Sequence, residues 1–236
     1  AEEEPQPDLP DRRTAQRLAG GLDWWATRTR PDISFVVSQL SSAATRAPLR
    51  ATALGKKCLR HLAGTRGHGI QLHAESHRLR EGGSQLQAFG DASYETGWAQ
   101  TGVLVKYQEM LVMWKSSRQP QVPRSTAESE CTAMAHSSQF LEGTCCRFHS
   151  MRVPIDVPTL WCDNRAAVHL TAGSSEWRTK TLVNKVLGVK SLIELNILLV
   201  KFKATADMVA DFLTEVMGAK LLSKQRQLVG CVPWRT

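Results

Sequence analysis

The apolar positions in the first part of the chain recur with the period of an α-helix. Leu18, Leu22 and Trp25 are spaced to share one helix face. A second helix is expected over about 33–40 and a third over about 49–62, each with apolar residues three or four positions apart. The pattern therefore predicts a small helical unit near the start of the chain.

Beyond residue 84 the pattern changes to short runs of apolar and β-branched residues, which are typical of strands. Three runs, at 86–91, 101–107 and 110–115, are separated by polar turns and predict an antiparallel meander. The elements that follow alternate between helices and strands, at 125–147, 159–162, 164–171, 178–194, 197–202 and 207–216. The order βββαβαβα predicts an α/β fold with a mixed sheet.

Two local sequences add detail to the helix predictions. Residues 125–128, Ser-Thr-Ala-Glu, fit a capping box, in which Ser125 and Glu128 satisfy the first amides of the following helix. Trp24 and Trp25 lie on an amphipathic helix, so we expect them to pack in its core rather than to stack on nucleic-acid bases. The helical unit is thus expected to bury its tryptophans.

Charge is spread unevenly over the 236 residues, whose net charge is +8. Residues 1–11 hold five acids and no base, whereas residues 12–80 hold 13 Lys or Arg against three acids. A basic segment of this kind suits a polyanion, because each neutralised phosphate releases counterions. A solubilising surface is the alternative that the charge count leaves open. With 42% hydrophobic and 22% charged residues, the composition excludes a disordered or fibrous chain.

These patterns divide the chain into four parts. They are an acidic, Pro-rich tail at 1–13, a basic helical connection segment at 14–72, an α/β domain at 84–216 and a C-terminal extension at 217–236. The chain begins with Ala rather than Met, which indicates a processed product or a piece of a longer one.

The cysteines and the apolar runs bear on the environment of the chain. Its six cysteines show no regular spacing, so we expect reduced thiols in an intracellular protein, cytoplasmic or nuclear, with an organelle also open. No apolar run approaches the roughly 20 residues that span a bilayer. A membrane-spanning segment is therefore not expected.

Acidic residues occur where predicted strands end and predicted helices begin. Asp91 and Asp163 follow strands, and Asp211 lies in the first turns of the last helix. Because ligands bind where neighbouring strands end, these acids are expected at one edge of the sheet. Glu128 or Glu130 could complete the cluster, but two residues apart on a helix they point about 200° from each other, so only one can face the sheet.

Convergent carboxylates repel one another unless a cation neutralises them, and hard oxygen ligands at an open site suit Mg²⁺ or Mn²⁺. The alternative that the spacing leaves open is that these acids cap helices and lie solvated at strand ends. The spacing alone therefore suggests a metal site without selecting it.

Six short sequences, taken in order, carry a resemblance to a known family. They are TRPDISF at 29–35, FGDAS at 89–93, WKSSRQ at 114–119, STAESECTA at 125–133, CDN at 162–164 and VADFLT at 209–214. In order and spacing they resemble the ribonuclease H domain of copia-type LTR retrotransposon polyproteins, with the segment that connects the reverse transcriptase to it. The resemblance covers about residues 14–216.

The resemblance implies an RNase H-like mixed five-stranded sheet and a metal-dependent endoribonuclease that cleaves the RNA strand of RNA–DNA hybrids. It also implies two bound Mg²⁺ ions, for which Mn²⁺ can substitute. The same four residues would bind these ions and carry out catalysis: Asp91, Glu130, Asp163 and Asp211. Glu128 is then the capping residue.

Contacts with nucleic acid are expected from basic and polar side chains: Asn164, Arg50, Lys56, Lys57, Arg60, Lys115 and Arg118. Asn164 could bond a 2′-hydroxyl of the substrate or cap the helix that it precedes, and both interpretations stay open. The implied partners are an RNA–DNA hybrid and a reverse-transcriptase polymerase domain or a larger protein assembly.

The sequence departs from the family pattern at several positions. Residues 181–183 are Thr-Leu-Val where the family has His-Ile-Asp, Cys131 replaces an aromatic residue and Glu215 replaces a lysine. A second hypothesis therefore stays open, in which the chain is a non-catalytic subunit reused as a structural or interaction component of a larger assembly. Retention of all four acids favours activity.

Overall fold

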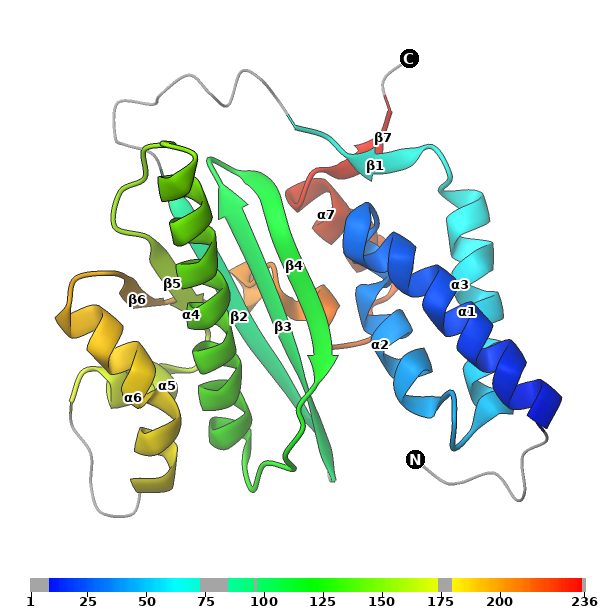
Figure 1. Ribbon diagram of the computed structural model, residues 1–236, viewed down its shortest axis with the longest axis horizontal. Coiled ribbons are helices and arrows are strands. Elements are labelled where there is room, and N and C mark those ends of the chain that lie inside the picture. The colour runs from blue at the N-terminus through cyan, green and yellow to red at the C-terminus, as the bar shows by residue number, and fades with distance from the viewer. Residues whose placement is uncertain (1–8, 73–84, 96, 174–179, 235–236) are drawn as a thin grey trace.

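A mixed five-stranded sheet lies at the centre of the computed structural model, which describes residues 9–72, 85–95, 97–173 and 180–234 (Figure 1). The strand order is β4-β3-β2-β5-β6. The first three strands form an antiparallel meander, and β5 and β6 add to it as parallel strands. The bounds are β2 Leu86–Glu95, β3 Trp98–Tyr107, β4 Met110–Arg118, β5 Thr159–Cys162 and β6 Leu199–Phe202. The predicted α/β fold with an RNase H-like mixed sheet is confirmed.

Three helices cover one face of the sheet. Helix α4 (Thr126–Ser150) crosses it, and α5 (Arg165–Thr171) and α6 (Lys180–Glu194) lie beside α4 (Figure 1). Alternate side chains of β2 and β3 point toward these helices. The core between the layers includes Leu86, Ala88, Val103, Val105, Met134 and Leu141. The helix predicted at 125–147 and the strand predicted at 159–162 are thus confirmed.

The opposite face is covered in part by a segment whose predicted structure is wrong. In place of the helix expected at 207–216, the chain forms two 3₁₀ turns, η4 (Thr205–Asp207) and η5 (Asp211–Leu213). Met208, Ala210 and Leu213 are all fully buried in one core cluster, so the segment is enclosed on several sides. A surface helix would instead leave a polar face in water.

The last described residues belong to the same core. Helix α7 (Ala219–Leu228) is followed by β7 (Cys231–Pro233), which pairs antiparallel with β1 (His68–Ile70). Val229 is buried in one cluster with Phe89 of β2. The segment that we separated as a C-terminal extension is therefore packed on the sheet, and the connection segment ends in a strand that the sequence pattern did not indicate.

The predicted helical unit is formed by α1 (Leu9–Arg28), α2 (Ser34–Ala43) and α3 (Pro48–Gly64), and it lies on the β4 side of the sheet (Figure 1). Helix α1 begins at Leu9, so residues 9–13, which we assigned to the tail, are helical. Residues 1–8 lie outside the described part of the chain.

The tryptophan pair of α1 is exposed, contrary to the prediction. Trp24 is 62% and Trp25 is 53% exposed. The buried face of α1 is formed by Ala15, Leu22 and Ala26, and the two alanines are small enough to let α1 approach α2 and α3 closely. The helical spacing therefore predicted the burial of Leu22 correctly, but Ala26 occupies the buried position that we predicted for Trp25.

Two features bear on the environment of the chain. None of the helices in the described ranges is long and apolar enough to cross a bilayer. All six cysteines are free, and four of them are buried.

A buried ion-pair cluster joins the helical unit to the end of the chain. Asp32, in the 3₁₀ turn η1 (Pro31–Ile33), accepts hydrogen bonds of 2.9 and 2.8 Å from Arg30 and lies 2.7 Å from Nε2 of His61 in α3. Arg226 of α7 lies 4.0 Å from the same carboxylate. Burial raises the pKa of Asp32, but hydrogen bonds from His61 and Arg30, together with their charges, hold it well below its usual value. Asp32 is thus ionised and links η1, α3 and α7.

Asp32→Asn should destabilise the protein by about 3–5 kcal/mol, because Arg30 and Arg226 are left buried without a countercharge. Urea unfolding of the wild type and the variant at neutral pH measures the difference. Asp23→Asn, at an exposed position of α1, is the control and should change the free energy of unfolding by less than about 0.5 kcal/mol. Equally small effects of both substitutions would show that the cluster does not hold the parts together.

Candidate active site

The four predicted acids converge beside the end of β5, but β2 continues to Glu95, so Asp91 lies within its strand and not at the strand end that we predicted. Strands β2 and β5 are parallel neighbours in which Gly90 pairs with Cys162, so Asp91 and Asp163, one position further on, lie side by side. Glu130 reaches them from the second turn of α4, and Asp211 from the start of η5. The cluster is assembled from two strands, a helix and a turn that are far apart in the sequence.

Two glycines allow the helix and the turn to approach the strands. A Cβ at Gly90 would collide with Ser137 of α4, and a Cβ at Gly102 of β3 would lie 2.9 Å from Cβ of Leu213. Backbones can come this close only where Cβ is absent. Gly102 is the strand partner of Asp91, so both close contacts are made at the level of the acids.

The carboxylates are close together and largely buried. Ligand atoms of Glu130, Cys162 and Asp163 all lie within 4.8 Å of one another. Asp91 is 8% and Glu130 is 5% exposed, and Asp163 and Asp211 are half-buried. Asp91 and Asp211 are not members of the 4.8 Å group, but both are near enough for their charges to act on Glu130.

Burial and mutual repulsion shift three of the acids in the same direction. Burial raises the pKa of Glu130 to about 9, and the charges of Asp91 and Asp163 contribute to the rise. Burial, followed by the charges of the same two aspartates, raises the pKa of Asp211 to about 8. Burial raises the pKa of Asp91 to about 6, although a hydrogen bond from Thr214 opposes the rise. The site therefore holds protons tightly and favours any cation that can replace them.

Two threonine hydroxyls orient the aspartates, and the sequence analysis missed both. Oγ1 of Thr214 donates to Oδ2 of Asp91, and Oγ1 of Thr205 donates to Oδ2 of Asp163 at 2.8 Å. Oγ of Ser93 in turn donates to the carbonyl oxygen of Thr214 at 2.7 Å. Thr214 closes the VADFLT sequence at 209–214, so its place in that motif was the available signal; Thr205 lies outside all six motifs.

The two glutamates of α4 point to different surroundings. Glu130 faces the acids, whereas Oε2 of Glu128 accepts a hydrogen bond of 2.7 Å from the Arg124 amide and Oε1 lies 3.4 Å from Nζ of Lys185. The amide hydrogen bond, ahead of the Lys185 charge, lowers the pKa of Glu128. Ser125 accepts from the Glu128 amide at 3.2 Å, so the cap forms, but its glutamate bonds the amide one position before the expected one.

The donor atoms of the cluster fit a hard divalent cation. Oε2 of Glu130 and Oδ1 of Asp211 are buried without a hydrogen-bond partner among the described residues. Buried carboxylate oxygens cost free energy unless they bind a proton or a cation. Burial raises the pKa of the neighbouring Cys162 thiol, which leaves oxygen atoms as the ready ligands. The residues present therefore match the metal chemistry that the sequence suggested.

The residues predicted to bind nucleic acid are not all on one surface. Arg50 of α3 and Arg118 at the end of β4 line one cleft. Lys115 projects to the α4 side of the sheet, where Nζ lies 5.3 Å from the centre of the Phe140 ring. Oδ1 of Asn164 accepts from the Ala167 amide at 3.0 Å, so Asn164 caps α5. Three further residues are exposed on α3: Lys56, Lys57 and Arg60.

Comparisons with known proteins identify relatives of this chain. It is 27% identical over 231 residues to a retrovirus-related Pol polyprotein from transposon RE2 of Arabidopsis thaliana, which covers 95% of this chain and 15% of that protein. It is 30% identical over 220 residues to the polyprotein from transposon RE1 of the same plant, with 89% of this chain and 14% of that protein covered. The chain thus spans only a small part of the length of these relatives.

A solved structure is also similar, and no protein-family model matches. The structure is LC11-RNase H1, isolated from compost, in complex with an RNA/DNA hybrid. The TM-score is 0.43 at 15% identity, and the similarity covers 56% of this chain and 93% of that chain.

Without metal ions, the protein should become more stable as the pH falls from about 9 to about 6. The folded-state pKa values of Glu130, Asp211 and Asp91, about 9, 8 and 6, lie above the value of about 4 that carboxyl groups have in an unfolded chain. The folded state therefore binds more protons in this range, and stability is lost as the pH rises through these values. Urea unfolding in EDTA across this pH range measures the effect.

Glu130→Gln should flatten this pH dependence most strongly at its alkaline end, because it removes the group with the highest pKa. Glu142→Gln, at an exposed position of the same helix, should leave the dependence unchanged. A free energy of unfolding that rises with pH in the wild type would contradict the buried and repulsive arrangement of the acids.

Proposed function

The chain is homologous to a segment of the retrovirus-related Pol polyproteins of transposons, and on this basis we propose that it is a metal-dependent ribonuclease H that cleaves the RNA strand of RNA–DNA hybrids. One observation carries the proposal. Carboxylates from β2, β5, α4 and η5 meet at one sheet edge, and two of their buried oxygens lack a hydrogen-bond partner among the described residues. Such a cluster is costly to the fold, and a catalytic cation accounts for its presence.

The ligands that we propose for two Mg²⁺ ions, or for Mn²⁺ in their place, are Asp91, Glu130, Asp163 and Asp211. The chemistry that divalent cations would supply here is activation of a water molecule and stabilisation of the leaving 3′ oxygen. The chain itself fixes the ligands, since Thr214 and Thr205 each hold one aspartate oxygen and leave the other available. This arrangement pre-orients the carboxylates before substrate binds.

Choice of the RNA strand requires a contact to its 2′-hydroxyl groups. Asn164 follows Asp163 directly, but its Oδ1 is occupied by the α5 cap. Nδ2 is not used by the cap and can donate two hydrogen bonds, so it is the atom that we propose for a bond to a 2′-hydroxyl. We propose this role in addition to the cap.

The second proposed partner is the polymerase part of such a polyprotein, because the relatives are far longer than this chain. The alternative function, a non-catalytic subunit of a larger assembly, differs from the enzyme in a measurable way. A non-catalytic chain would have no requirement for cation binding at the acids.

With Mg²⁺ or Mn²⁺, the chain should nick the RNA strand of a labelled hybrid and spare double-stranded DNA of the same sequence. Asp163→Asn should lower the rate by about a hundredfold or more, because a displaced ligand misaligns water and phosphate. Calorimetric titration with Mn²⁺ gives a second readout, and Asp163→Asn should weaken binding in the absence of substrate.

Glu128→Gln is the matched control, since its side-chain oxygen can still accept from the Arg124 amide while only the 3.4 Å contact to Lys185 loses its charge. Cleavage and Mn²⁺ binding should survive this substitution. Absence of cleavage together with absence of Mn²⁺ binding in the wild type would favour the non-catalytic subunit.

A further inference from the structure

A cleft of about 220 Å³ separates the helical unit from the sheet. One wall is the end of α2 and the start of α3, and the other is formed by the end of β4, the end of β2 and the start of β3. The lining residues are Gln39, Ser42, Ala43, Arg50, Leu54, Glu95, Trp98 and Arg118. The cleft therefore lies between two parts of the chain that the sequence analysis treated separately.

The two walls are fixed relative to each other by a fully buried side chain. Nε2 of Gln100, in β3, donates to Oγ of Ser38 in α2 and to Oγ of Ser116 in β4, each at 2.8 Å. Ser116 donates in turn to the carbonyl oxygen of Leu213 in η5 at 2.5 Å. Because η5 also carries Asp211, these hydrogen bonds connect the cleft to the acid cluster.

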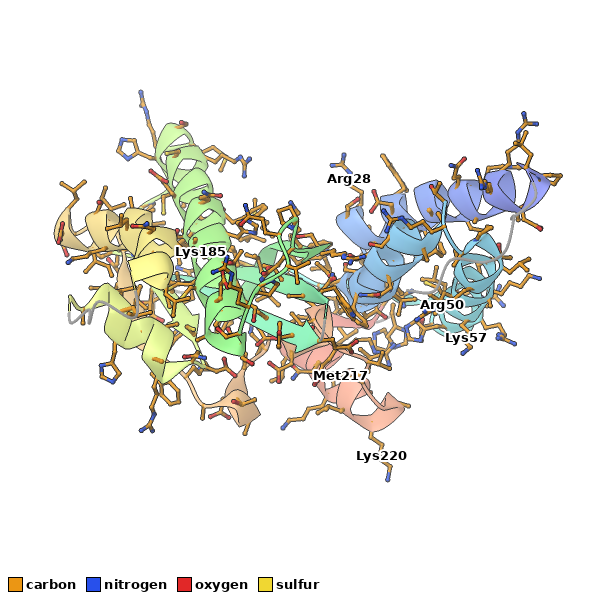
Figure 2. The ribbon with its side chains drawn as sticks, turned by 90° about the horizontal axis from the view of Figure 1, so that it is seen from below. Arg28, Arg50, Lys57, Lys185, Met217 and Lys220 are labelled. Carbon is orange, nitrogen blue, oxygen red and sulfur yellow. The ribbon has the colours of Figure 1, made fainter. Side chains whose placement is uncertain are left out.

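The charge of the cleft is positive. Two arginines line it, Arg50 from the first turn of α3 and Arg118 from the end of β4, against one carboxylate, that of Glu95. The Glu95 carboxylate accepts a hydrogen bond of 3.0 Å from Nε1 of Trp98. Figure 2 shows Arg50 and Lys57 on α3, in cyan. Guanidinium groups bind phosphate oxygens in pairs of parallel hydrogen bonds, which makes two of them on opposite walls suited to one phosphate.

The cleft lies on the same sheet face as Asp91. Side chains alternate along a strand, so Asp91, Ser93 and Glu95 of β2 share this face. Four residues of strand span about 13 Å. A phosphate bound in the cleft is therefore too far from the acids to be the scissile one.

We propose that this cleft binds one backbone phosphate of the hybrid away from the scissile phosphate, and that Arg50 and Arg118 hold that phosphate together. The inference rests on the proposed function, because the hybrid is the ligand. It adds a site formed jointly by the helical unit and the sheet. The unit then sets where the duplex lies along the sheet.

The test measures binding rather than cleavage. The protein carries Asp163→Asn, and Ca²⁺ replaces Mg²⁺. The probes are short RNA–DNA hybrids that each contain one neutral methylphosphonate linkage at a different position of either strand. One linkage should weaken binding by about tenfold in this protein and should have no effect once Arg50 or Arg118 is replaced by Ala. No position with this dependence would overturn the proposal.

Salt dependence separates one shared phosphate from two independent ones. The double variant Arg50→Ala with Arg118→Ala should reduce the slope of log K against log salt by about 0.9 in total, because the two arginines neutralise one phosphate. A reduction of about 1.8 in the double variant would mean that each arginine binds its own phosphate, which would overturn the proposal. Lys57→Ala combined with Arg118→Ala is the control pair and should be additive, since Lys57 does not line the cleft.

Two further measurements distinguish a failure of the cleft proposal from a failure of the proposed nuclease function. Arg50→Lys keeps the charge but not the paired hydrogen bonds, so it should restore the salt slope without restoring full affinity. Cleavage is assayed in the chain without the Asp163 substitution. Cleavage without the position-dependent effect would overturn the cleft alone, and the position-dependent effect without cleavage would overturn the nuclease alone.

Discussion

Close backbone approach at two glycines is the constraint on which the site depends. Gly90 admits α4 from one face of the sheet and Gly102 admits η5 from the other, at the level of Asp91. Without these contacts, Glu130 and Asp211 would sit on separate layers with strand side chains between them. The two absent Cβ atoms thus determine how many carboxylates can meet at one edge, and with that the charge of the site.

The same type of side chain is used in two opposite ways in this fold. Burial acts on Asp32 and on Asp91 alike, but Asp32 faces Arg30 and His61, whereas Asp91 faces other carboxylates. The first arrangement favours the charged form and strengthens the connection between distant segments. The second disfavours the charged form and destabilises the fold unless a proton or a cation neutralises the carboxylates.

How much of the molecule could be predicted depends on how local the signal is. The meander, α4 and β5 follow from short-range periodicity and a capping sequence. Of the acids, Asp163 follows from the end of β5, whereas the choice of Glu130 over Glu128 came from the family resemblance. The turns at 205–213 could not be predicted, because Met208 and Leu213 are enclosed by residues remote in sequence. Local pattern also could not show that Ala26 would displace Trp25 from the helix interface, or that the hydroxyl of Thr205 would reach Asp163.

Pairing of β1 with β7 makes the order in which the chain is synthesised matter. Gln71 and Pro233, which are hydrogen-bonded beside this pair, are 162 positions apart, so β1 has no partner until almost the whole chain has been made. During that interval its edge is open to other chains, as unpaired strand edges generally are. A product that stops before α7 would keep that edge permanently and would also lack Arg226 beside Asp32. Synthesis of β7, rather than the formation of the central sheet, is therefore the step that closes the edge of β1.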